Sequence, residues 1–340
     1  MAAKEKAAKT LGVGLDVGTM NLVSARRKGG DKVETSRMRD AFLDLEAGAK
    51  KMLKLSGVNF IDRGEEEGII VVGDAALEMA NVFGREARRP LSQGLISAGE
   101  TEALDVLGVL VKNVLGEPQE KGEVCFFSVP AAPVDQERDV VYHRGVFERI
   151  VTECGYDAIP SNEAMAIIFA ETAKEGFSGL GISFGSGMCN LALAINGIEG
   201  LAFSVARGGD WIDEGAAKAT GSTRSRVCAL KEKGIDLLKP EGREQEALVL
   251  YYKSLVEYCI DQTAREFARI KDRFSLPSAI PIVVSGGTSL AGSFLPFFEQ
   301  VFEKKRKRFP IEVSEIRQAS DPMNAVARGL LIQAMQEYEE

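Results

Sequence analysis

Short apolar runs bounded by glycine alternate along the chain with longer stretches at helical spacing. Leu11–Val17 is an apolar run followed by Gly-Thr-Met and a return through Asn-Leu-Val-Ser-Ala, which predicts two strands joined by a tight turn. Further short apolar runs predict strands at Gly68–Val72, Val124–Val129, Gly179–Ser183, Leu191–Ile195 and Ile280–Ser285. Repeated alternation of strands with helices indicates α/β layers.

Helical spacing marks most segments between these strands. It predicts helices at Ala41–Leu55, Glu100–Val114, Gln136–Gly155, Ser161–Ala173, from about Ser289, and at Ala319–Met335. Residues 211–275 are expected to be largely helical, with an apolar stripe through Leu248, Leu255, Cys259 and Phe267. Ser161 and Asn162 are candidate N-caps of the helix that follows them.

Two distant segments of the chain resemble each other. Residues 11–22 read LGVGLDVGTMNL, and residues 180–191 read LGISFGSGMCNL. Both place apolar residues before a turn rich in glycine and hydroxyl groups, and both return to an apolar strand through Asn-Leu. This internal repeat predicts two lobes that each open with a hairpin, with the two turns facing each other across a cleft.

The predicted fold class is α/β with two lobes, each a mixed sheet with flanking helices and a smaller inserted subdomain. Lobe I takes residues 11–158 plus 320–340, with its inserted subdomain at 37–87. Lobe II takes residues 159–319, with its inserted subdomain at 205–280. Residues 1–10 are small and charged, and we expect them to form a flexible tail.

The predicted turns have the composition of phosphate-binding loops. Glycine has no Cβ to block close approach, so a turn rich in glycine, serine and threonine can aim several backbone N–H groups at one anion. Asp16 ends the first strand, where its carboxylate could hold a hydrated Mg²⁺ beside the phosphates. Either turn alone is more often an ordinary hairpin, whereas the paired occurrence favours a nucleotide site.

Composition narrows the class of protein. The 340 residues are 45% hydrophobic, and 42 Lys and Arg against 50 Asp and Glu leave a formal charge of −8, which argues against coating nucleic acid or an anionic membrane. No apolar run is long enough to span a bilayer, and the first ten residues do not resemble a secretory signal. Five scattered cysteines suggest reduced thiols, so we expect a cytoplasmic protein.

Two further features favour plain structural interpretations. The chain has one histidine, His143, which excludes a zinc site that needs two and is interpreted as a surface residue of a helix. The basic stretch KKRKR at 304–308 is interpreted as a solvated face or a contact between subunits, because no aromatic residues are interleaved with it.

Seven motifs occur in an order that resembles one known superfamily. They are GLDVGTMN at 14–21, PLSQGLI at 90–96, SVPA at 128–131, SNEAMA at 161–166, GGDWID at 208–213, VVSGGT at 283–288 and DPMNAVARG at 321–329. Together they resemble the superfamily of actin, heat-shock chaperones and sugar kinases, and within it the bacterial actin-like proteins MreB and MamK. The resemblance spans about residues 11–335 and implies an actin-like fold.

The resemblance also implies a site for ATP or ADP with Mg²⁺, in which catalysis rests on positioning and charge stabilisation. Glu163 would orient the attacking water, and Asp16 would hold a magnesium-bound water, with Ser183 as the second metal-site residue. The nucleotide contacts would be Gly18, Thr19, Met20, Asn21, Gly185, Ser186, Gly187, Met188, Gly208, Gly209, Asp210, Lys231, Gly286, Gly287 and Thr288.

Two positions depart from the pattern of the superfamily. The second phosphate loop normally begins with Asp, where this chain has Ser183, and the adenosine contact normally has Glu, where this chain has Cys228. Replacing a carboxylate near a metal by a neutral hydroxyl weakens the interaction with the metal. We therefore expect the chain to bind nucleotide and to hydrolyse it slowly or not at all.

The resemblance implies an ATP-binding cytoskeletal protein that polymerises into filaments with nucleotide-dependent assembly. Its partner would be a second copy of itself, with an unidentified cargo or adaptor, no nucleic acid and no direct membrane insertion. The alternatives are a non-polymerising ATP-binding scaffold or pseudo-ATPase, and a small-metabolite kinase of the same fold. Sedimentation with and without ATP separates the filament from both.

Overall fold

The computed structural model describes residues 11–30, 32–58, 60–270 and 279–339. They form two compact units. Unit 1 takes in the described residues of Met1–Ser128, Val141–Ser161 and Leu330–Glu340, and unit 2 those of Val129–Val140 and Asn162–Gly329. The expected tail at 1–10 and the last residues of the helical region 211–275 lie outside the described residues.

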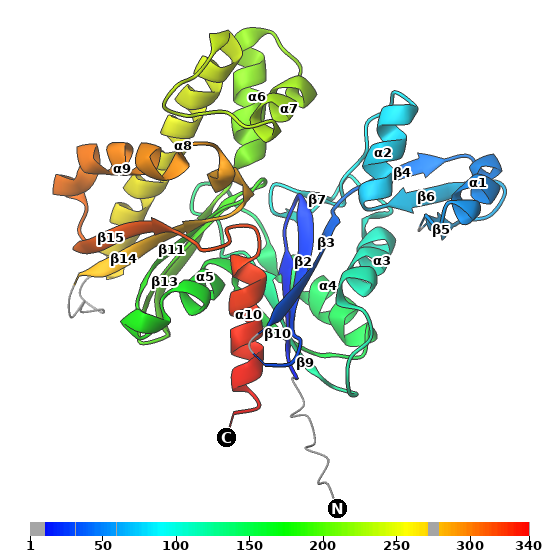
Figure 1. Ribbon diagram of the computed structural model, residues 1–340, viewed down its shortest axis with the longest axis horizontal. Coiled ribbons are helices and arrows are strands. Elements are labelled where there is room, and N and C mark those ends of the chain that lie inside the picture. The colour runs from blue at the N-terminus through cyan, green and yellow to red at the C-terminus, as the bar shows by residue number, and fades with distance from the viewer. Residues whose placement is uncertain (1–10, 31, 59, 271–278, 340) are drawn as a thin grey trace, which may run out of the picture. The chain divides into compact units, whose positions relative to one another are not determined.

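Unit 1 is built on a five-stranded sheet with the order β10-β9-β1-β2-β3. The strands are β1 (Val13–Val17), β2 (Asn21–Arg27), β3 (Val33–Arg39), β9 (Val124–Val129) and β10 (Asp157–Asn162). β1 is antiparallel to β2 and parallel to β9, and β2 is antiparallel to β3. The helices that accompany the sheet are α3 (Ala103–Leu115), α4 (Val140–Glu153) and the last turns of α10 (Ala325–Gln336) (Figure 1).

A smaller sheet is inserted after β3. It has the order β4-β6-β5, from β4 (Phe42–Leu45), β5 (Phe60–Asp62) and β6 (Ile69–Val72), with η1 (Ala47–Ala49), α1 (Lys50–Leu55) and α2 (Asp74–Val82). Leu53 of α1 and Ala76 and Ala80 of α2 pack against one face of this sheet. A two-stranded hairpin, β7 (Leu91–Ser92) and β8 (Leu95–Ile96), follows.

Unit 2 repeats the sheet of unit 1, with the order β13-β12-β11-β14-β15. Its strands are β11 (Gly179–Phe184), β12 (Cys189–Ile195), β13 (Ile198–Val205), β14 (Ile280–Ser285) and β15 (Val313–Gln318). Its helices are α5 (Glu163–Glu171), η2 (Ala173–Glu175), α6 (Gly209–Thr220), α7 (Arg224–Glu232), α8 (Gly242–Ile270), η3 (Gly287–Leu290), α9 (Phe294–Lys305) and η4 (Arg306–Arg308). β11 is antiparallel to β12 and parallel to β14, as β1 is to β2 and β9.

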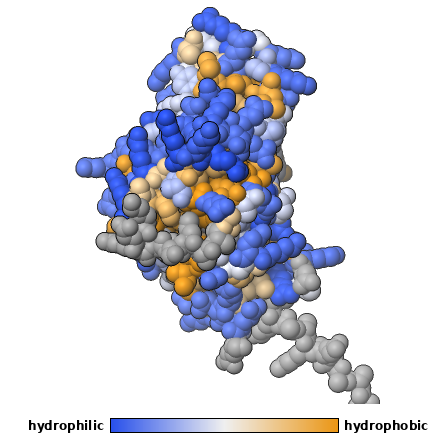
Figure 2. Space-filling model, turned by 90° about the vertical axis from the view of Figure 1, so that its left-hand side faces the viewer, coloured by the Kyte–Doolittle hydropathy of each residue, from blue (hydrophilic) through white to orange (hydrophobic). Residues whose placement is uncertain are grey.

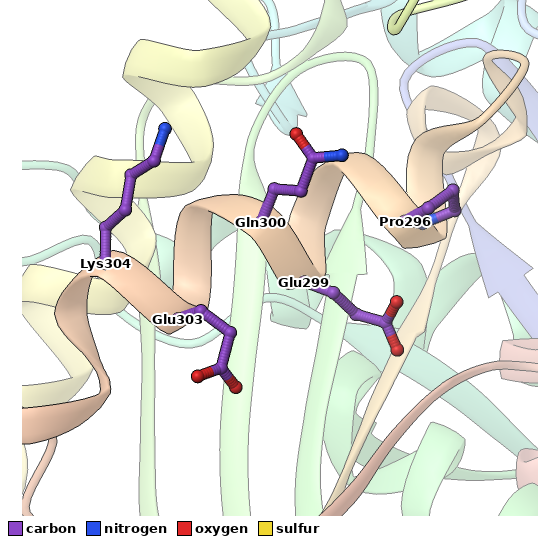
Figure 3. Close-up of a pocket in the computed structure, with 5 residues that line it drawn as sticks. All are labelled: Pro296, Glu299, Gln300, Glu303 and Lys304. Carbon is purple, nitrogen blue, oxygen red and sulfur yellow. The ribbon is translucent and has the colours of Figure 1, made fainter.

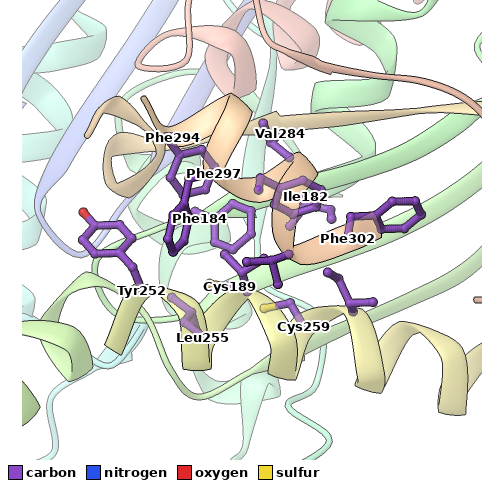
Figure 4. Packing of buried hydrophobic residues seen from close by; sticks show 14 of the residues in the cluster. Ile182, Phe184, Cys189, Tyr252, Leu255, Cys259, Val284, Phe294, Phe297 and Phe302 are labelled. Atoms are coloured by element: carbon purple, nitrogen blue, oxygen red, sulfur yellow. The ribbon is translucent and has the colours of Figure 1, made fainter. Parts of the chain in front are cut away.

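Aromatic packing holds the helices of unit 2 on its sheet. Phe184 of β11 lies edge-on to Phe294 of α9, with ring centroids 5.2 Å apart (Figure 4). It also lies edge-on to Phe298 of α9, at 6.1 Å. Cys189 and Cys259 are fully buried in the same core (Figure 4), and the predicted stripe on α8 faces it. The face in Figure 2 is mostly hydrophilic, with apolar side chains in small separate areas. Burial of the aromatic and aliphatic side chains in this core is the main contribution to the stability of unit 2.

The predicted strands are confirmed, and several predicted helices have different limits. Residues 42–45 belong to strand β4, so the helix predicted at Ala41–Leu55 is wrong in its first half. α4 begins at Val140 and α10 at Ala325, later than predicted, and η3 precedes α9. The helix predicted from Ser161 begins at Glu163 because Asp157–Asn162 forms β10; Asn162 caps it by accepting the N–H groups of Ala164 and Met165.

His143 is buried, which corrects its interpretation as a surface residue. Its side chain is 1% exposed, and its ring lies 4.8 Å from that of Phe147. His143, Val146, Phe147 and Ile150 share the inward stripe of α4, because residues three and four apart lie on one helix face. Within the described residues neither ring nitrogen has a hydrogen-bond partner, and burial lowers the pKa of His143 to about 4.

None of the helices in the described part of the chain is long and apolar enough to cross a membrane.

Candidate functional site

The turn between β1 and β2 is shaped by Gly18. Its N–H donates to the carbonyl of Asn21 at 3.1 Å, and a Cβ on Gly18 would lie only 2.7 Å from that same oxygen. Glycine is therefore the residue that this turn accommodates without a shift of the backbone. Among the described residues, the backbone N–H groups of Thr19 and Met20 have no hydrogen-bond partner. They are open donors for an anion.

The turn between β11 and β12 repeats this geometry around Gly185. Its N–H donates to the carbonyl of Met188 at 3.1 Å, and an added Cβ would lie 2.7 Å from that oxygen. Over the described chain, the backbone N–H groups of Ser186 and Gly187 also lack a partner. Each turn therefore presents glycine-permitted space and open backbone donors, which fit a phosphate group.

The strand registers fix how the two repeated segments correspond. Val17 pairs with Leu22 in the first hairpin, and Phe184 pairs with Cys189 in the second. Gly18 therefore corresponds to Gly185, in agreement with the order Asp16-x-Gly18-Thr19 and Ser183-x-Gly185-Ser186 in the sequence. The two Asn-Leu pairs occupy different places in their hairpins, because they lie two residues apart in this correspondence.

Asp16 lies next to the first turn and is held by Ser128 on the parallel neighbour β9. The Ser128 hydroxyl donates to Asp16 Oδ1 at 3.1 Å and accepts the N–H of Val17 at 2.7 Å. Burial raises the pKa of Asp16 to about 7, and the bond from Ser128 opposes that rise. A nearby cation would favour the charged carboxylate, so Asp16 suits a place beside a metal.

Direct metal coordination by a cluster of side chains is not supported. The described residues contain no group of three His, Cys, Asp or Glu side chains that could hold a metal ion. A Mg²⁺ beside Asp16 would therefore keep several of its waters, as this ion usually does in phosphate sites.

Segments far apart in sequence converge on the second turn. At the start of α6, Gly209 N–H donates to the carbonyl of Gly185 at 3.0 Å, and Asp210 N–H donates to that of Ser186 at 2.8 Å. The Thr288 hydroxyl donates to the carbonyl of Gly185 at 2.9 Å. The segments 208–210 and 286–288 thus adjoin the turn, and their contact with a nucleotide stays a prediction. The Asp210 carboxylate pairs with Arg224 at 2.7 Å.

Lys231 also lies beside the start of α6, where it forms a buried ion pair that the sequence did not suggest. Its Nζ donates to Asp213 Oδ2 at 2.7 Å and to the carbonyl of Gly209 at 3.3 Å. Asp213 is 1% exposed; burial raises its pKa, and Lys231 opposes that rise. Asp213 thus supplies a carboxylate next to Cys228, the position where the resemblance to the superfamily leads one to expect Glu. Its position at the end of the Gly-Gly-x-x-x-Asp motif was the available signal.

Glu163 begins α5, and both of its carboxylate oxygens accept hydrogen bonds. Ser183 Oγ donates to Oε1 at 2.5 Å, and Asn190 Nδ2 donates to Oε2 at 2.7 Å. Asn190 was missed as a site residue, because in the sequence it looked like the start of the returning strand.

Two groupings of predicted site residues thus emerge, one in each unit. Asp16 and the turn from Gly18 to Asn21 lie in unit 1. Glu163, Ser183, the Gly185 turn, Lys231 and the 208–210 and 286–288 segments lie in unit 2. The expectation that the two turns face each other across a cleft stays a prediction.

A separate hollow of about 580 Å³ lies along α9. Pro296, Glu299, Gln300, Glu303 and Lys304 line it, all from one helix (Figure 3). None of the predicted site residues lines it, so it is distinct from the candidate site.

The chain has an actin-like fold, which comparison with known structures confirms. The chain is similar to a MamK double helical filament at TM-score 0.69 and 17% identity, covering 97% of this chain and 99% of that one. It is similar to MreB5 of Spiroplasma citri bound to AMPPNP at TM-score 0.66 and 16% identity, covering 96% and 97%. It is similar to the ethanolamine utilization protein EutJ from Carboxydothermus hydrogenoformans at TM-score 0.52 and 16% identity, covering 94% and 88%.

Within this fold the chain belongs to the Volactin family, whose model matches residues 11–334. No curated protein sequence matches it significantly.

Proposed function

We propose that this protein is an actin-like ATP-binding cytoskeletal protein that polymerises with itself. The observation that carries the proposal is the repeated turn: Gly18 and Gly185 make the same backbone bond, exclude a Cβ at the same distance and leave backbone donors open. Two such turns in one actin-like chain match the need of a di- or triphosphate for several donors.

Each group around the turns has a role in this proposal. The backbone donors of both turns bind phosphate oxygens, and Lys231 with the 286–288 segment lies on the side of the nucleoside. Asp16 holds water molecules of a magnesium ion, which when bound supplies charge neutralisation at the phosphates. The buried carboxylate of Asp16 is stabilised in its charged form by that cation.

Hydrolysis in this proposal depends on Glu163. Its carboxylate accepts a hydrogen bond from the attacking water and thereby orients it toward the terminal phosphate. The reaction is slow, because a hydroxyl at Ser183 replaces the acid that the superfamily usually has beside the metal.

Self-association is supported by the likeness to MamK, whose solved structure is a double helical filament. Head-to-tail contacts between unlike surfaces do not close, so they extend into filaments. A nucleotide that binds one conformation better shifts the population toward it and thereby changes the affinity between subunits. We propose a cytoplasmic location, because the five scattered cysteines suit reduced thiols.

Two measurements on the purified full chain test the proposal. Titration calorimetry with ATP and Mg²⁺ is expected to detect binding, and sedimentation is expected to show a pellet that grows with ATP. Electron microscopy of the pellet identifies filaments. Binding without a pellet over a range of salt and protein concentrations supports a non-polymerising ATP-binding scaffold. Absence of binding would falsify the nucleotide site.

A further inference from the structure

The strand pairing of unit 2 places two donors side by side in front of Glu163. Ser183 of β11 and Asn190 of β12 are directly paired in the antiparallel register, and they are 1% and 0% exposed. Directly opposed residues of an antiparallel pair point to the same face of the sheet. Their side chains donate to the two oxygens of one carboxylate, at 2.5 and 2.7 Å.

The direction of the Asn190 amide is set by a second bond. Its Oδ1 accepts the backbone N–H of Ala131 at 3.2 Å, so its Nδ2 faces Glu163. Ala131 is itself held on β13, because the Ser204 hydroxyl donates to the Ala131 carbonyl at 2.8 Å. The Asn190 amide that donates to Glu163 is therefore held by the backbone of Ala131, which is in turn bonded to Ser204 of β13.

We propose that Ser183 and Asn190 are positioning residues that hold the Glu163 carboxylate for the attacking water, and that Ser183 acts on Glu163 instead of on a metal ion. This inference rests on the proposed hydrolysis of ATP. One bond to each oxygen fixes the plane of the carboxylate, which can accept more than two hydrogen bonds. Short bonds to a charged acceptor are the strong kind, which suits them to this task.

The proposal reverses the expectation for an aspartate at position 183. If Ser183 were part of a metal site, Ser183→Asp would restore a missing charge and improve catalysis. In the observed geometry, it would instead replace a donor by a second carboxylate at the same oxygen of Glu163. The two negative charges would repel each other, and Glu163 would leave its position.

Phosphate release and nucleotide binding, measured on the full chain, test the proposal. Ser183→Ala and Asn190→Asp are each expected to lower kcat by about 10- to 100-fold, with KM changed by no more than about twofold. In a Glu163→Gln background, Ser183→Ala is expected to cause no further loss, because its effect runs through Glu163. Calorimetry with and without Mg²⁺ is expected to show the same metal dependence in the wild type and Ser183→Ala.

Controls separate positioning from stability. Ser183→Thr keeps the hydroxyl and is expected to restore kcat relative to Ser183→Ala. Ser24→Ala removes another buried strand serine, which donates to the Val114 carbonyl at 2.7 Å, and is expected to leave kcat unchanged.

Two results would overturn the proposal. The first is a Ser183→Asp variant with higher kcat and a stronger Mg²⁺ dependence of nucleotide affinity. The second is a wild type that binds ATP and releases no phosphate, which refutes positioning for hydrolysis while nucleotide binding stands. A wild type that binds no nucleotide refutes the proposed function itself.

Discussion

The two hairpins share one backbone geometry and differ in the polar side chain two residues before the turn glycine. Asp16 and Ser183 both lie two residues before the turn glycine, and each neighbours a serine of the parallel strand, Ser128 or Ser285. The first hairpin carries an acid at this position. The second carries a hydroxyl, and the nearby charge comes from Glu163. A repeated backbone thus presents open N–H donors twice, while the side chain two residues before the glycine differs between the two turns.

The largest effect is expected from filling the space at either turn. Gly18→Ala and Gly185→Ala each place a Cβ about 2.7 Å from a backbone carbonyl, so the turn must shift and its open donors move. Loss of one or two bonds to a charged ligand corresponds to roughly a 10- to 100-fold loss of ATP affinity, measurable by calorimetry. Gly48→Ala, with open space around it, is the matched control. Unequal losses would show that the turns do not contribute alike.

The next largest effect is expected from removing the charge of Asp16, because Ser183 carries no charge at the equivalent position. Asp16→Asn keeps the shape of the side chain and removes its charge, so the increase in ATP affinity that Mg²⁺ provides is expected to fall by roughly tenfold. Affinity in the absence of Mg²⁺ should change little. If Mg²⁺ increases the ATP affinity of Asp16→Asn as much as that of the wild type, Asp16 does not act on the metal, and the proposed difference between the two hairpins is wrong.

The acid also makes the nucleotide-free protein sensitive to pH. The pKa of Asp16 is raised from 3.8 to about 7, so the folded state binds its proton more tightly than the unfolded chain. The stabilisation that this proton provides is complete below pH 4 and is lost as the pH rises toward 7.

Asp16→Asn is expected to remove that loss. From pH 4 to pH 7, the free energy of unfolding of the variant should therefore rise by about 1–3 kcal/mol relative to that of the wild type. Denaturant unfolding at both pH values measures the difference. His143, whose pKa is lowered, titrates with the opposite sign, but it is present in both proteins and cancels. Identical pH profiles would contradict the burial of the Asp16 charge.

The smallest effects are expected from removing the hydroxyl of the serine beside each hairpin. Ser128→Ala removes the acceptor of the buried Val17 N–H as well as a donor to Asp16, whereas Ser285→Ala removes one bond to the Pro322 carbonyl. An orphaned buried donor costs about 1–3 kcal/mol, and a simple lost bond costs about 1 kcal/mol. Denaturant unfolding should therefore rank Ser128→Ala below Ser285→Ala in stability, and the reverse order would contradict this account.

The sequence located most of the apolar strands, although β4 was predicted as part of a helix, and it missed polar strands at sheet edges. Val124–Val129 and Ile280–Ser285 are buried and read as uninterrupted apolar runs, as predicted. β3 and β15 lie at sheet edges, β3 mostly exposed and β15 mostly half-buried, and their sequences VETSRMR and VSEIRQ show no apolar pattern. Edge strands are specified by the neighbour that they pair with, which a single sequence does not display.

The repeat of the two hairpins and the match of their turn glycines were visible in the sequence. Side chains alternate between faces with a period of two, so a shift of two residues would leave the inward and outward pattern unchanged. The pairing of Val17 with Leu22 and of Phe184 with Cys189 excludes such a shift and sets Gly18 against Gly185.

By itself, the order of apolar runs, glycine turns and short motifs determined the α/β class and the residues around which a nucleotide site is proposed. These are local properties, because backbone freedom at glycine and burial periodicity act within a few residues. Tertiary structure alone decided that Ser183 and Asn190 meet Glu163, that Asp213 pairs with Lys231 and that His143 is buried. Such contacts depend on which strands and helices become neighbours, and burial then fixes the partner that each polar group must find.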